Sequence, residues 1–171
     1  MVKELLSRDP GGLALSVSAT TRPPRTGEQH GSDYFFVSEA EFARMDGAGE
    51  LLEWAEVFGN RYGTPKDYVE SHLDAGTDVL LEIDVVGAER VRAVHPEAVL
   101  ILLEPPALSE LRRRLEGRGT ESPERIEARL AKAEWEMAQA PWFDHVVVND
   151  DLLRASSEVA AIIDASRNRG S

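Results

Sequence analysis

Several common residue patterns are missing from this 171-residue sequence. It has no cysteine, which excludes a disulfide framework and any thiolate metal site. It also has no run of eighteen apolar residues, and its first residues (MVKELL) lack the long apolar core of a secretory signal. We therefore expect one soluble, cytoplasmic domain, because 42% hydrophobic content over this length is enough for a substantial core.

Positive charge is scarce and unevenly distributed. The formal net charge is −12, and only three of the nineteen basic residues are lysines. An acidic surface repels phosphate backbones and anionic lipids, so we expect neither nucleic acid nor membrane as a partner. The arginines cluster at Arg22 and Arg25 and again within residues 112–118. Guanidinium groups grip phosphate bidentately, which favours a small anionic ligand, while surface salt bridges are the alternative left open.

Apolar runs alternate with helical patterns along most of the chain. We expect strands at residues 13–17, 34–36, 51–58, 78–84, 98–103 and 145–148. Helices are expected at residues 38–46, 87–95, 108–116 and 122–139, with a further helix closing the chain. This alternation predicts an α/β fold with a parallel sheet. Ligands of such sheets bind at the carboxyl ends of the strands, where Glu82, Asp84, Glu104 and Asn149 fall.

Local signals predict how three of these segments begin or turn. Ser38 and Glu41 form the sequence pattern of a capping box, in which Glu41 reaches back to the start of the helix. Residues 59–63 are expected to form a turn, followed by a helix with Thr64 as N-cap and Pro65 at its first position. Residues 22–31 are rich in turn formers and predict an ordered loop.

That loop is a candidate phosphate site. Pro23 and Pro24 stiffen it and hold Arg22 and Arg25 three residues apart, so that both guanidinium groups could bind one phosphate. A proline-rich surface turn is the competing interpretation. Tyr34 and Tyr62 could add phenolic donors, although a single tyrosine is more often a packing residue.

An ordered set of motifs covers nearly the whole chain: residues 16–25 (SVSATTRPPR), 27–28 (GE), 31–36 (GSDYFF), 53–64 (EWAEVFGNRYGT), 81–88 (LEIDVVGA), 105–106 (PP), 114–120 (RLEGRGT), 129–130 (RL) and 148–151 (VNDD). In these motifs the sequence resembles the guanylate kinases, nucleoside monophosphate kinases that phosphorylate GMP from ATP. The resemblance implies the parallel sheet of P-loop nucleoside monophosphate kinases. It further implies a single domain over residues 1–171, with a GMP-binding subdomain at about 32–64 and a lid at about 114–130.

The resemblance also implies which residues bind GMP. Its phosphate would be held by Arg22, Arg25, Tyr34 and Tyr62, and its guanine would be read by Ser18, Glu53, Thr64 and Asp84. Guanine presents N1–H and an amino group beside its O6 acceptor, so the Glu53 carboxylate suits the two donors and hydroxyls suit O6. Adenine reverses this pattern, and unpaired polar groups can then discriminate by about 10⁴-fold or more.

For the other substrate the resemblance implies a second set of residues. Arg114, Arg118 and Arg129 would converge on the transferred phosphoryl group as catalytic residues, since catalysis of this reaction is positioning and charge neutralisation. Pro106 and Asn149 would border the adenine of ATP. Glu82 would help to hold water around the Mg²⁺ that accompanies ATP.

One family element has no match in the sequence. Guanylate kinases begin with a strand and a G-x-x-G-x-G-K-[ST] loop that cradles the ATP phosphates, whereas these residues contain no Gly-Lys pair. We therefore expect the first core strand and the phosphate loop to be absent and phosphotransfer by this chain to be weak. Three hypotheses stay open: a guanylate kinase whose true start lies upstream, a non-catalytic module that binds GMP or a phosphopeptide, and a non-functional remnant.

Overall fold

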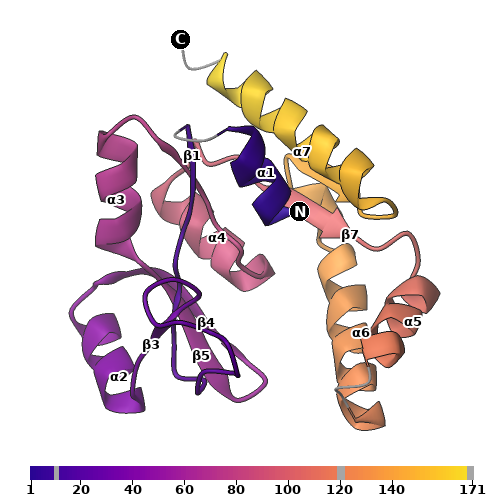
Figure 1. Cartoon of the computed structure of the whole chain (residues 1–171), viewed down its shortest axis with the longest axis horizontal. Coiled ribbons are helices and arrows are strands. Elements are labelled where there is room, and N and C mark those ends of the chain that lie inside the picture. The colour runs from indigo at the N-terminus through magenta and orange to yellow at the C-terminus, as the bar shows by residue number, and fades with distance from the viewer. Residues whose placement is uncertain (10–11, 119–121, 169–171) are drawn as a thin grey trace. The chain divides into compact units, whose positions relative to one another are not determined.

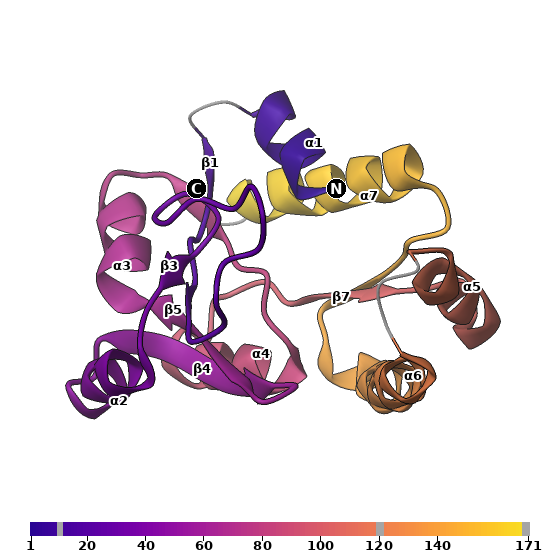
Figure 2. The ribbon, with the colours of Figure 1, turned by 60° about the horizontal axis from the view of Figure 1, so that its bottom comes forward.

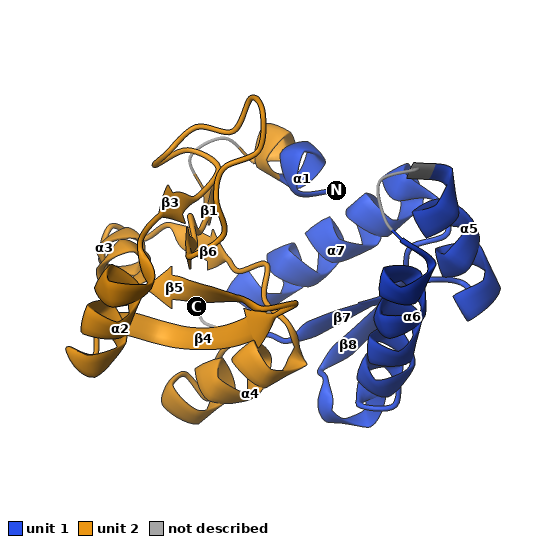
Figure 3. Cartoon of the chain, turned by 90° about the horizontal axis from the view of Figure 1, so that it is seen from below, with its two compact units in different colours: residues 1–5, 99–171 blue, residues 6–98 orange. Residues whose placement is uncertain are grey.

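The computed structural model describes residues 1–9, 12–118 and 122–168, and its chain forms two compact units. Unit 2 comprises Leu6–Ala98, and unit 1 comprises Met1–Leu5 and Val99–Ser171 (Figure 3). The mixed α/β fold with parallel strand pairs agrees with the expected fold class. The elements in chain order are α1 (Val2–Arg8), β1 (Leu13–Leu15), β2 (Ala19–Thr20), β3 (Phe35–Phe36), α2 (Glu39–Gly47), β4 (Leu51–Val57), β5 (Asn60–Pro65), α3 (Lys66–Asp74), β6 (Asp78–Leu80), α4 (Val85–Val94), β7 (Ile101–Glu104), α5 (Leu108–Arg118), α6 (Pro123–Met137), a 3₁₀ turn (Ala140–Trp142), β8 (His145–Val148) and α7 (Leu152–Arg167) (Figure 1).

Unit 2 contains a parallel strand pair and a mixed four-stranded sheet. Strands β1 and β6 are parallel, with Leu13 opposite Asp78. The second sheet has the order β3-β2-β5-β4, and its β4–β5 hairpin is antiparallel. Helix α2 lies beside β4 (Figure 2), where the fully buried Phe42 meets the Trp54 ring edge to face at 6.1 Å. Its β4–β5 hairpin carries five of the sixteen residues that line the candidate site, namely Glu53, Ala55, Val57, Tyr62 and Gly63.

Unit 1 is built on the parallel pair β7–β8. Helix α7 packs on β8, with Val147, Ala155 and Val159 buried. Helices α5 and α6 lie side by side in Figures 1 and 2 and share an apolar cluster of Leu111, Leu115, Ile126 and Leu130. None of the helices in the described part of the chain combines the length and apolar character needed to cross a bilayer.

Two local predictions at the hairpin were wrong. Residues 60–63 belong to β5, and the reversal is confined to Phe58 and Gly59, whose φ angles are 51° and 77°. Thr64 does not cap a helix, because it lies in β5 and α3 begins at Lys66 with Pro65 as its N-cap. The sequence signal was misleading because pairing with β4 carries the strand through Thr64 to the proline.

Helix starts were predicted more accurately. Ser38 and Ser122 stand at two of the expected starts, and each accepts a hydrogen bond from a backbone N–H of the first turn. Asp151 caps α7 in the same way, although the sequence did not mark it as a cap. The reciprocal half of the predicted capping box does not form, since the Glu41 carboxylate accepts from Arg44 instead. Strands β1 and β6 are shorter than expected, which leaves residues 16–18 and 81–84 as irregular segments that enter the cavity described next.

Candidate functional site

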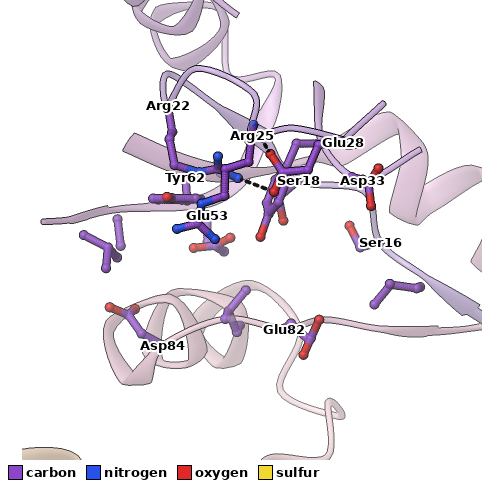
Figure 4. Close-up of a pocket in the computed structure, with 16 residues that line it drawn as sticks. Ser16, Ser18, Arg22, Arg25, Glu28, Asp33, Glu53, Tyr62, Glu82 and Asp84 are labelled. Carbon is purple, nitrogen blue, oxygen red and sulfur yellow. Dashed lines mark hydrogen bonds and ion pairs between the residues drawn. The ribbon is translucent and has the colours of Figure 1, made fainter. Parts of the chain in front are cut away.

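A cavity of about 350 Å³ lies in unit 2, among the segment after β1, the 22–34 loop, the β4–β5 hairpin and the segment after β6 (Figure 4). Eight of the residues selected from the sequence line it: Ser18, Arg22, Arg25, Tyr34, Glu53, Tyr62, Glu82 and Asp84. Thr64 is not among the lining residues and sits behind the wall, fully buried. Positions up to 66 residues apart in sequence therefore share one polar cavity.

The guanine-reading candidates centre on a buried carboxylate. Glu53 is only 6% exposed, and Thr64 Oγ1 donates a 2.7 Å hydrogen bond to its Oε1 atom. The two residues are directly opposite each other on β4 and β5, which sets this geometry. Burial raises the pKa of the Glu53 carboxyl, with the neighbouring Asp84 adding to the rise and the Thr64 hydrogen bond opposing it. A hydroxyl has one proton, so while Thr64 donates to Glu53 it cannot also donate to a ligand oxygen.

The start of α4 is packed against the same carboxylate. Asp84 is the N-cap and accepts from the Gly87 backbone N–H at 3.0 Å. A Cβ atom on Gly87 would lie only 2.6 Å from Glu53 Oε2, so glycine is needed for this close approach. The Leu81-to-Ala88 motif therefore places Asp84 in the cavity and also leaves room for Glu53.

The phosphate candidates lie close together in the same cavity. The Arg22 guanidinium carbon lies 5.3 Å from the Tyr34 ring centre, and the Tyr34 and Tyr62 rings are 6.0 Å apart. Arg22 Nη2 donates to Glu28 Oε1 at 2.9 Å, and the Arg25 backbone N–H donates to Glu28 Oε2 at 2.7 Å. This contact raises the pKa of Arg22 and lowers that of Glu28. The arginine is thus already held by a carboxylate, the kind of anion its planar fork recognises.

Two threonines anchor the loop that carries these arginines. The fully buried Thr20 donates through Oγ1 to the Arg61 carbonyl at 2.9 Å and accepts from the Arg22 backbone N–H at 3.2 Å. Thr21 Oγ1 accepts from the Arg61 backbone N–H at 3.0 Å. The loop base is thereby fixed to β5 next to Tyr62, which explains the two adjacent threonines in the motif.

The remaining sequence-selected residues lie in unit 1. Arg114 on α5 donates to Glu110 Oε1 at 2.9 Å and to the Asn149 carbonyl at 2.9 Å, so two of them are in contact. Pro106 comes after β7, and Asn149 comes directly after β8. The Asn149 N–H donates to the Glu104 carbonyl and so connects the ends of these two parallel strands. Arg129 lies on α6. Arg118 ends α5, its side chain falls outside what the structure describes, and so do residues 119–121 of the expected lid.

The donor set suits a hydrated magnesium ion rather than a dedicated metal cage. Within the described residues no cluster of three or more metal-binding side chains occurs. Mg²⁺ is commonly held by one or two carboxylates together with water and substrate phosphates. Glu82, an exposed carboxylate lining the cavity, fits that requirement.

The sequence did not single out several groups that shape this cavity. Glu28 was seen only as part of a Gly-Glu motif, although it is the direct partner of Arg22. Gly87 was part of the strand motif without a role. Ser16 and Asp33 also line the cavity, and no spacing rule marks a single serine or aspartate. Their position depends on how distant segments meet in the fold.

Together the fold and the cavity suit a nucleotide-binding protein of the α/β class, because arginines and tyrosines share one polar cavity with a buried carboxylate. Residues 1–166 match the family model described as guanylate kinase. The sequence is 51% identical over 168 residues to a guanylate kinase of Symbiobacterium thermophilum, covering 98% of this chain and 79% of the relative. It is 57% identical over 148 residues to a guanylate kinase of Streptomyces coelicolor, covering 86% and 75%.

A solved structure gives the same result. The crystal structure of guanylate kinase from Anaplasma phagocytophilum aligns with a TM-score of 0.81 at 38% identity, covering 96% of this chain and 79% of that one. The chain belongs to the guanylate kinase family.

Proposed function

We propose that the cavity in unit 2 binds GMP and that the protein transfers the terminal phosphoryl group of ATP to it, giving GDP and ADP. The observation that carries this proposal is the buried Glu53–Thr64 pair in one cavity with Arg22, Tyr34 and Tyr62. One part of that cavity suits the edge of guanine and the other suits a phosphate monoester. Few ligands besides a guanine nucleotide present both.

The guanine assignment follows from donor and acceptor chemistry. Glu53 has two carboxylate oxygens, which can accept from guanine N1–H and from the exocyclic amino group. Thr64 holds that carboxylate from behind, and thus acts on the base through Glu53 while Ser18 is available to donate to O6. Asp84 supplies a further carboxylate at the same end. Adenine would place its N1 lone pair against Glu53 and is disfavoured by the unpaired, buried charge.

The phosphate wall would do two things for the reaction. Arg22, Arg25 and the two tyrosines fix the GMP phosphate, so that one of its oxygens can attack the terminal phosphorus of ATP. A bond forms from that oxygen to phosphorus, and the bond between phosphorus and the bridging oxygen of ADP breaks. Glu28 keeps the Arg22 guanidinium oriented before substrate arrives. The bound phosphate then competes with Glu28 for Arg22.

The arginines of unit 1 would act on ATP. We assign Arg114, Arg118 and Arg129 to the transferred phosphoryl group and Pro106 and Asn149 to the adenine, following the family pattern in the lid at about 114–130. Arg114 could exchange its present partners for a phosphate, since these are the Glu110 carboxylate on α5 and the Asn149 carbonyl after β8. Glu82 would help to hold water around the Mg²⁺ that accompanies ATP, and that ion would neutralise phosphate charge. We expect all of this chemistry in the cytoplasm.

We further propose that residues 1–171 by themselves bind GMP well and transfer phosphate slowly. The reason is that they include no G-x-x-G-x-G-K-[ST] loop, the usual source of backbone N–H groups for the ATP phosphates. The guanine-reading half of the cavity would serve no purpose in a phosphopeptide-binding module, so GMP is the ligand we favour.

Calorimetric titration of the 171-residue chain with GMP, AMP and a phosphoserine peptide tests the binding proposal. We expect saturable binding of GMP and at least 10³-fold weaker binding of AMP, in line with the cost of unpaired buried polar groups. Binding of the phosphopeptide in preference to GMP would support the non-catalytic module instead. A coupled ATP-and-GMP assay tests the second proposal, which ordinary family-like turnover by this chain would refute.

A further inference from the structure

The Ser16 hydroxyl is a buried polar group that the proposed GMP contacts do not use. Ser16 follows β1, lines the cavity and is only 7% exposed. Its Oγ atom has no hydrogen-bond partner among the residues that the structure describes. Such groups are rare in folded proteins because an unpaired buried hydroxyl is unfavourable, and they call for an explanation.

The backbone holds Ser16 in place independently of its side chain. Its N–H donates to the Leu80 carbonyl at 3.0 Å, continuing the parallel β1–β6 pairing by one residue. Ser16 and Ser18 are two positions apart, and both line the cavity. In Figure 4 the Ser16 hydroxyl is directed toward the middle of the cavity. The hydroxyl is therefore presented to the cavity without being required for the strand.

The surroundings of Ser16 indicate which part of a nucleotide it would meet. In Figure 4 Ser16 lies between Asp33 and Glu82, on the side of the view away from Arg22 and Tyr62. Two carboxylates make this region unsuitable for a phosphate group, and the guanine edge is already matched by Glu53. A sugar hydroxyl is uncharged and both donates and accepts, so it suits a serine hydroxyl beside carboxylates.

We propose that Ser16 is a ribose-binding residue of this cavity, whose hydroxyl forms a hydrogen bond with a sugar hydroxyl of the bound nucleotide. The inference rests on the proposed GMP-binding function and extends it, because it concerns discrimination between ribonucleotide and deoxyribonucleotide.

The test compares three nucleotides on matched serine variants of the 171-residue chain. GMP, 2′-deoxy-GMP and 3′-deoxy-GMP are titrated by calorimetry against the unaltered chain, Ser16→Ala and Ser156→Ala. Ser156 on α7 is the control, because it is fully buried and its hydroxyl is already bonded to the Leu152 carbonyl at 2.6 Å. Ser16→Cys is a second variant that keeps the side-chain size and weakens the hydrogen bond.

One neutral hydrogen bond corresponds to about a 2- to 10-fold change in affinity. We expect the unaltered chain to bind one deoxynucleotide more weakly than GMP by that factor. Ser16→Ala should lose the same factor for GMP and no longer distinguish the two, whereas Ser156→Ala should still distinguish them. The melting temperature of Ser16→Ala should not fall, since it loses an unpaired hydroxyl.

Other results would overturn the inference in distinguishable ways. Wild-type affinity of Ser16→Ala for all three nucleotides would show that the hydroxyl makes no ligand contact. Equal weakening for all three, with a lower melting temperature, would show a packing role. If the unaltered chain bound no GMP, the proposed function itself would fail and this inference with it.

Discussion

Two sets of arginines in this molecule are held in different ways. Arg22 in unit 2 is surrounded by Glu28, Tyr34, Phe36 and a loop anchored by threonines, and its side chain is 12% exposed. On α5 of unit 1 the arginines are more open. Arg112 pairs with Glu127 across to α6, and Arg113 pairs with Glu110 in the preceding turn. Arg114 shares Glu110 and also reaches the Asn149 carbonyl.

Under the proposed function, this difference would separate GMP recognition in unit 2 from phosphoryl transfer by arginines that change partners in unit 1. Buried, mutually bonded polar groups lose little freedom when a ligand binds, so the unit 2 cavity is organised in advance for a particular ligand shape. Exposed ion pairs contribute little stability and exchange partners easily. The α5 arginines can therefore leave their carboxylates for a phosphoryl group at low cost, which suits residues that act only when ATP is present.

Substituting Glu53 by glutamine should have the largest effect on GMP affinity. Glutamine keeps the size but presents one acceptor and one donor, so one guanine donor would face an N–H group. Hydrogen bonds to a charged group contribute about 1.5–3 kcal/mol each, which predicts a loss of about 100-fold or more. Calorimetry measures it. Glu56→Gln, on the exposed side of the same strand, is the control and should retain wild-type affinity. A Glu53→Gln loss below threefold would refute the guanine assignment.

The next largest effect should come from Arg22→Lys. Lysine keeps the charge but cannot make the bidentate contact, so we expect GMP affinity to fall by about 30-fold while guanosine affinity is unchanged. Arg114→Lys provides the contrast, and its GMP affinity should stay within about twofold of wild type. Both are measured by the same titration. Equal losses in the two variants would abolish the distinction between a recognition arginine and an exchangeable one.

Gly87→Ala tests whether GMP binding requires Glu53 to keep its position in the cavity. The added methyl group would lie 2.6 Å from Glu53 Oε2 and 3.1 Å from the Ile83 Cβ atom, so the carboxylate must move. We expect about a 10-fold loss of GMP affinity, equivalent to about one charge-assisted hydrogen bond. Gly117→Ala on α5 has no such contact and should leave GMP affinity unchanged. A Gly87→Ala chain that bound GMP normally would show that Glu53 need not stay where it is.

The sequence predicted which elements form and which residues line the cavity better than it predicted the contacts between those residues. Apolar runs and caps located most elements, because Ser38 and Ser122 act within their own turn of chain. Eight of the residues selected from the sequence motifs line one cavity. The sequence did not predict the hydrogen bond from Thr64 to Glu53, because a threonine before a proline has the local pattern of a helix cap. Pairing of β4 with β5 overrides that local pattern.

The same limit applies to Glu28 and Gly87. Glu28 follows a turn and has no local reason to reach Arg22, and the need for glycine at position 87 comes from a carboxylate 34 residues earlier in the chain. Both depend on contacts between segments that are distant in sequence. The fold class, by contrast, follows from strand and helix periodicity, which is local information.

The smallest expected effect is on the pH dependence of stability, and its sign should differ between the two regions. Burial raises the folded-state pKa of Glu53 above its ordinary value of 4.5. Above about pH 4.5 the unfolded chain releases this proton before the folded chain does, so the free energy of unfolding declines until the pH passes the raised pKa. Glu53→Gln should remove that decline, which urea unfolding between pH 4 and pH 8 would detect.

Glu110 on α5 provides the opposite case for the same measurement. Its hydrogen bonds with Arg113 and Arg114 lower its pKa to about 2. The folded chain therefore releases this proton first, and the stabilisation is present above about pH 4.5 and is lost as the pH falls toward about 2. Glu110→Gln should reduce stability at neutral pH and flatten the acid limb, with the effect diminished by salt because the pair is partly exposed. If both variants changed the pH dependence in the same direction, the contrast between a buried cavity carboxylate and a surface-paired one would not hold.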